Sequence, residues 1–71
     1  MDRDFVEKSL AMVEGHVAQG ERIIARQREI VAASELSGRG DAGKAKELLA
    51  LFEETQLLHV DHRDRLRRDL L

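Results

Sequence analysis

The five residues Ser37-Gly-Arg-Gly-Asp41 separate two long segments in which apolar side chains recur every three or four positions. That period is typical of an amphipathic α-helix, and the chain contains no proline that would interrupt one. Gly38 is expected to be a left-handed C-terminal cap, and Asp41 the N-cap of the following helix. The sequence therefore predicts an all-α fold in one domain over residues 1–71, with a helix over about 4–36, a loop over about 37–41 and a helix over about 42–70.

The short connection makes the two helices antiparallel neighbours, because a loop of a few residues cannot reach the far end of the first helix. Each helix carries a seam of heptad spacing, which is the pattern of helices that pack at a shallow angle. In the first helix the expected seam consists of Val6, Leu10, Val13, Val17, Gly20, Ile24, Gln27, Val31 and Ser34. In the second helix it consists of Ala45, Leu48, Phe52, Thr55, His59, His62 and Leu66.

The apolar arc of each helix is wider than contact with one partner helix requires. Ile23 and Ile30 flank the seam of the first helix, and Leu51 and Leu58 flank that of the second. If these side chains were all exposed, they would form a patch larger than soluble monomers usually carry. The hairpin is therefore expected to form a homodimer, as an antiparallel four-helix bundle, or to offer this face to a partner protein.

The three histidines fall in one region when positions whose numbers sum to roughly 79 are paired across the hairpin. His59 then lies opposite Gly20, and His62 lies beside His16. The spacing most favours a partly buried polar layer that sets the register of the helices. Three neutral imidazoles could instead bind zinc, which makes His16, His59 and His62 a candidate metal site and zinc the one candidate cofactor. A third interpretation is a pH-sensitive layer, because clustered imidazoles repel one another once protonated.

The strongest basic cluster lies near the end of the chain. It consists of Arg63, Arg65, Arg67 and Arg68, with aspartates between them. Charged residues make up 37% of the chain but the net charge is only −2, so the surface exerts little long-range attraction on nucleic acid. Two phenylalanines are the only aromatic residues, which leaves little surface for base stacking. Nucleic-acid binding is not expected, and RNA binding stays a weaker alternative.

No nucleophile–base pair and no paired carboxylates stand out, so we expect neither catalytic residues nor enzyme activity. The segment 38–44 partly matches a phosphate-binding loop, but Ala45 stands where Ser or Thr is needed and a helix replaces the preceding strand. Without cysteine the chain has no disulfide and no thiolate ligand. No apolar run is long enough to span a membrane, and the charged start does not match a signal peptide, so we expect a cytoplasmic protein.

Three stretches carry a resemblance to known sequences: Gly20-Glu-Arg-Ile-Ile-Ala-Arg-Gln-Arg-Glu-Ile-Val31, Leu48-Leu-Ala-Leu-Phe-Glu-Glu-Thr-Gln56 and His59-Val-Asp-His-Arg-Asp-Arg-Leu66. With them the chain resembles a group of short uncharacterised helical-hairpin proteins, mainly from alphaproteobacteria. The resemblance covers most of the chain and implies a natural, standalone small protein, but it supplies no activity, cofactor or site residue. The expected function is a non-enzymatic helical protein–protein interaction module. A metal- or pH-sensing histidine bundle is the main alternative.

Overall fold

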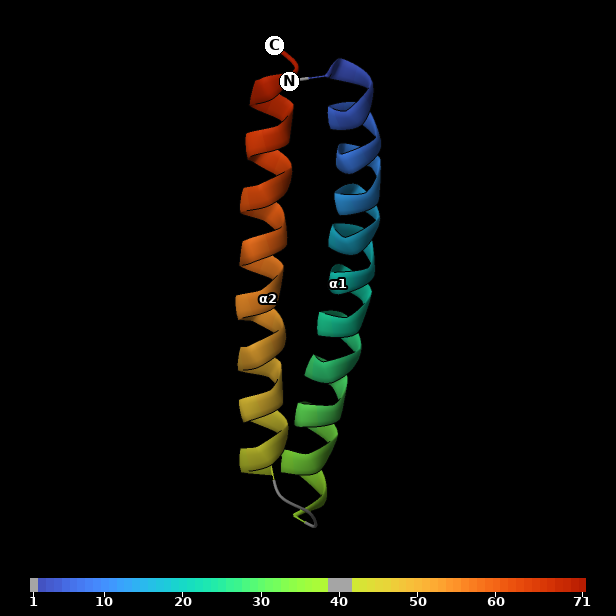
Figure 1. Cartoon of the computed structure of the whole chain (residues 1–71). Coiled ribbons are helices and arrows are strands. Elements are labelled where there is room, and N and C mark those ends of the chain that lie inside the picture. The colour runs from blue at the N-terminus through green and yellow to red at the C-terminus, as the bar shows by residue number, and fades with distance from the viewer. Residues whose placement is uncertain (1, 39–41) are drawn as a thin grey trace.

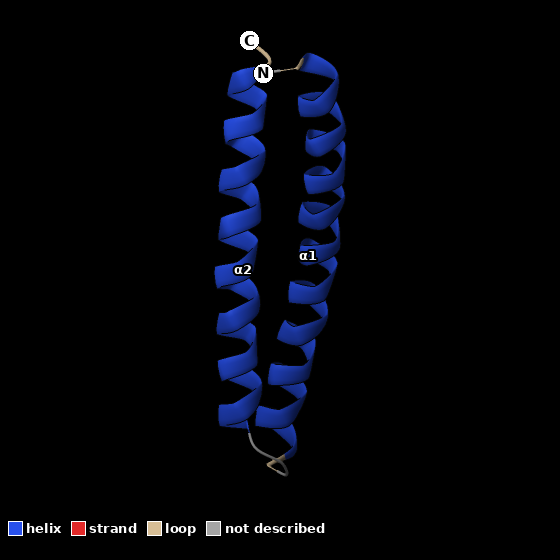
Figure 2. Ribbon diagram, in the orientation of Figure 1, coloured by secondary structure: helices blue, strands red, loops and turns tan. Residues whose placement is uncertain are grey.

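The computed structural model describes residues 2–38 and 42–71, which form two α-helices. Helix α1 spans Arg3–Ser37 and helix α2 spans Ala42–Asp69. The helices lie side by side and antiparallel, so the first turn of α1 is next to the last turn of α2 (Figure 1). The described residues contain no strand (Figure 2). The all-α helical hairpin predicted from the sequence is therefore confirmed.

Both ends of α1 have side-chain or backbone caps. Asp2 is the N-cap, and its carboxylate accepts a hydrogen bond of 3.1 Å from the backbone N–H of Asp4. Gly38 ends the helix with φ 64° and ψ 7°, a left-handed conformation that glycine adopts without a side-chain clash. This confirms the predicted glycine cap. The predicted N-cap of α2, Asp41, lies outside the described residues.

The buried side chains of α1 follow the predicted seam. Val6 is only 2% exposed, and with Val13, Val17 and Leu66 it forms the tightest part of the core. This cluster lies at the end of the hairpin where α1 begins and α2 ends (Figure 1). All the buried residues of α1 belong to the predicted set; they are Val6, Val13, Val17, Ile24, Gln27 and Val31.

Three predicted seam positions of α2 are wrong. Leu48, Thr55 and His62 are exposed, whereas the residue that follows each of them is half-buried. At residues 55 and 56 the contacts show the difference: the Thr55 hydroxyl donates to the carbonyl of Leu51, 3.0 Å away, on its own helix. The side chain of Gln56 instead finds a partner on α1, described below. Ala45, Phe52, His59 and Leu66 keep their predicted places at the interface.

The two edges of the helix–helix interface differ in chemistry. On one edge, charged side chains of the two helices form ion pairs with each other, and on each helix these residues are spaced by seven or fourteen positions. We call this edge the ion-paired edge. Its pairs are Glu14–Arg67 at 3.0 Å, Arg28–Glu53 at 3.3 Å and Glu35–Lys46 at 3.0 Å. We call the opposite edge the open edge; its residues, again seven apart, are Ser9, His16, Ile23, Ile30, Leu48, Thr55, His62 and Asp69.

Candidate functional site

We call the side of the hairpin formed by the open edge and its outward neighbours the open face. It contains most of the large apolar side chains that the described residues leave exposed. Their exposed fractions run from 38% at Ile30 to 70% at Leu58. A gathering of exposed apolar side chains on one side of a protein is typical of an interaction surface, so the open face is the first candidate site. Its exposed apolar members are Phe5, Met12, Ile23, Ile30, Leu48, Leu51 and Leu58.

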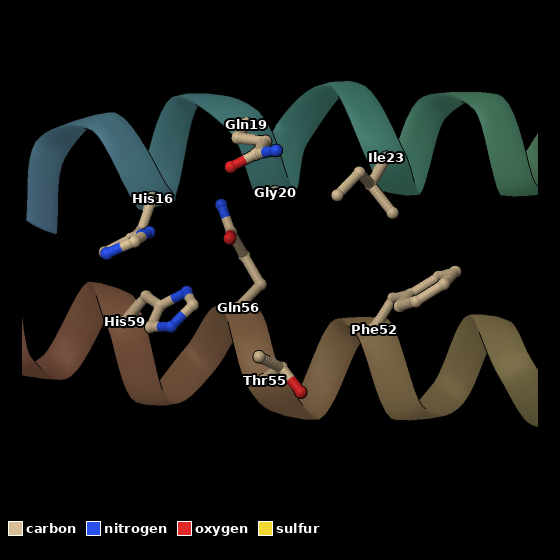
Figure 3. A pocket seen from close by; sticks show the side chains of 8 residues that line it. All are labelled: His16, Gln19, Gly20, Ile23, Phe52, Thr55, Gln56 and His59. Carbon is tan, nitrogen blue, oxygen red and sulfur yellow. The ribbon is translucent and has the colours of Figure 1, made fainter.

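A hollow of about 90 Å³ opens between the helices on this face. Figure 3 shows its lining, with His16 and His59 on one side of Gln56 and with Ile23 and Phe52 on the other. Thr55 also borders the hollow, but its side chain points away from α1 (Figure 3). Residues of both helices meet here. The hollow lies on the open edge, because His16, Ile23 and Thr55 belong to that edge.

The side chain of Gln56 fills the space that Gly20 leaves on α1. Its Nε2 donates a hydrogen bond of 2.9 Å to the carbonyl of Val17. A Cβ on residue 20 would overlap Oε1 of Gln56, so this contact requires glycine. Oε1 itself is buried and has no hydrogen-bond partner among the described residues. The heptad pairing predicts His59 opposite Gly20; that prediction is wrong, because Gln56 occupies the site.

A second glutamine makes the reciprocal contact from α1 to α2. Gln27 is 6% exposed, and its Nε2 donates a hydrogen bond of 3.0 Å to the carbonyl of Ala45. Each helix thus sends one amide across the interface to the backbone of the other. A buried amide that finds its acceptor at one offset of the helices favours that register over its neighbours.

The structure brings together two of the three histidines predicted to form a site. The rings of His16 and His59 are stacked, with centroids 5.2 Å apart and planes inclined by 26°. His62 lies one turn further along α2 and is exposed. Over residues 2–38 and 42–71, no three histidine or carboxylate side chains stand close enough to share a metal ion. The three-histidine set is therefore reduced to a pair.

Carboxylates accompany most of the basic cluster. Arg67 pairs with Glu14 of α1, and Arg63 pairs with its neighbour Asp64 at 3.1 Å. Arg65 contacts a carboxylate of its own helix at 3.5 Å. A phosphate group would have to compete with these carboxylates for the arginines, which weakens the case for nucleic-acid binding.

Comparison with protein-family models, curated proteins and solved structures finds no match to this chain. The resemblance to the alphaproteobacterial group therefore stays an expectation. The helices that the structure describes contain no segment both long and apolar enough to cross a membrane.

Proposed function

We propose that this protein is a non-enzymatic helical interaction module whose first partner is a second copy of itself. The two hairpins pack through their open faces into an antiparallel four-helix bundle. The observation that carries the proposal is the gathering of exposed apolar side chains, such as Ile23 and Leu51, on one face of the hairpin. The proposed location is the cytoplasm, as expected from the sequence.

The distribution of charge favours a second copy over a highly charged partner. The open edge carries a single carboxylate, Asp69 near the end of α2, and no lysine or arginine. A two-fold interface sets the same patch against itself, so an edge with few charged residues meets little repulsion there. The charges of the other edge are already compensated by ion pairs within the hairpin, such as Glu14–Arg67.

The size of the face is also suitable. The Cα trace extends over 53 × 14 × 14 Å. A second hairpin that packs along this length can contact the open face from one end of the rod to the other. Dimerisation would also supply burial that a chain of this size lacks alone, because small domains bury a low fraction of their surface.

The proposal is tested by the mass of two matched variants. Leu51→Glu places a charge on the open face, where the leucine is 56% exposed in the hairpin. Leu36→Glu makes the same chemical change near the end of α1, where the leucine is 89% exposed and lies off the open face. Light scattering should give a dimer for Leu36→Glu and the mass of one chain, 8.1 kDa, for Leu51→Glu. Equal masses for the two variants would contradict the proposed interface.

A further inference from the structure

We propose that His16 and His59 form a two-nitrogen site for a divalent transition-metal ion, in which water fills the remaining coordination positions. The site goes beyond the proposed dimerisation, because it lies within one hairpin and joins α1 to α2. Its ligand set also differs from the three histidines expected from the sequence, since His62 is not a member.

The two imidazoles already lie close enough to converge. Their centroids are 5.2 Å apart, and they extend from different helices. Metal–nitrogen distances are about 2.0–2.1 Å, so the ligating nitrogens must approach one another and turn toward a common point. The terminal torsion of histidine is soft, and His16 is exposed, so its ring can turn without disturbing the core.

The surroundings of the pair leave room for a small ligand. His16 and His59 line the hollow of about 90 Å³, together with the amide of Gln56 (Figure 3). A water takes about 30 Å³ of liquid volume, so the hollow has room for an ion and a small number of waters.

The chemistry of the ligands restricts the choice of metal. Imidazole nitrogen suits zinc, copper and nickel, whereas calcium and magnesium prefer oxygen ligands. With two protein ligands, the remaining coordination positions are open to water. Binding would hold α1 and α2 together, because the metal interacts with both helices only in the folded hairpin.

The site is tested with copper(II) and zinc on the full chain. Electron paramagnetic resonance of the copper(II) complex should show two coordinated nitrogens and one ion per chain. Added zinc should raise the melting temperature of the wild type. His16→Gln should weaken zinc binding about tenfold or more, measured by calorimetry, and His59→Gln should do the same. The matched control His62→Gln should bind zinc as the wild type does.

Three results would overturn the site. They are the loss of binding in His62→Gln, equal binding in wild type and His16→Gln, and a copper spectrum with a single nitrogen. Because His16 is exposed, His16→Gln is expected to keep the helical circular dichroism of the wild type, so weaker binding in that variant reports the ligand and not unfolding. Light scattering at each zinc concentration separates a site within one hairpin from metal bridges between molecules. Binding that appears only as the mass rises would also contradict the proposal.

Discussion

The amide of Gln56 on α2 occupies the position where a side chain on Gly20 of α1 would begin. The same amide donates to the carbonyl of Val17, so a missing side chain on one helix is matched by a long polar one on the other. This contact replaces the glycine–histidine layer expected from the sequence. It also sets His59 one turn away, where it stacks on His16.

Replacing Gly20 should therefore differ from replacing Gly15, which has no neighbouring atoms around the position of a new Cβ. In a helix interior, Gly→Ala stabilises by roughly 0.5–1 kcal/mol. We expect that gain for Gly15→Ala. Gly20→Ala should fall short of it by about 1 kcal/mol, because the methyl group displaces the Gln56 amide and breaks its hydrogen bond. Urea unfolding at one protein concentration measures both.

The pair Gly20→Ala and Gln56→Ala supplies the control. Once Gln56 is truncated, the methyl group at residue 20 has room, so Gly20→Ala should stabilise that background as Gly15→Ala stabilises the wild type. If Gly20→Ala and Gly15→Ala gave the same gain in the wild type, the contact would have no energetic role.

Gln27 should contribute more to the free energy of unfolding than an exposed polar residue of the same helix does. Gln27→Ala removes a side chain that is 6% exposed, together with its bond to the Ala45 carbonyl, and should cost about 1–3 kcal/mol. Arg22→Ala removes a long polar side chain that is exposed, and should change stability by less than about 0.5 kcal/mol. Thermal unfolding of the two variants tests this difference, and equal costs would count against a register role for Gln27.

The ion-paired edge should contribute weakly and depend on salt. Arg28 and Glu53 pair at 3.3 Å while remaining largely exposed, so their coupling is expected to be about 0.2–1 kcal/mol. Arg28→Glu and Glu53→Arg should each destabilise the hairpin, and the double exchange should recover most of the loss. A double-mutant cycle at low salt and at about 1 M salt measures the coupling, which should shrink at high salt. Strictly additive single changes would show that the pair is not coupled.

Much of the fold was predictable because the helical period of the apolar residues stops at the same place as the glycine-rich loop begins. The heptad seam of α1 and the glycine cap at Gly38 follow from local rules of helix formation, and the structure confirms both. The seam of α2 was harder to predict. Its sequence offers two neighbouring choices at every second seam position. Hydrophobicity cannot separate Leu48 from Leu49, and it favours Thr55 over Gln56.

The structure prefers Gln56 to Thr55 for a reason that lies on the other helix. Gln56 fits the interface because a glycine faces it at Gly20 and because the backbone carbonyl of Val17 is within reach. The sequence feature that indicates this contact is Gly20 itself, but the heptad pairing predicts His59 and not Gln56 opposite it. Which of two polar residues fills a gap depends on the exact offset of the helices, and periodicity does not determine an offset of a few residues.

The association of two hairpins through the open face is the central claim, and sedimentation equilibrium tests it most directly. The wild-type chain of 8.1 kDa should sediment with twice that mass at neutral pH, and dilution should convert it into the single chain in one reversible step. A stable, compact species of 8.1 kDa at every concentration would contradict the claim.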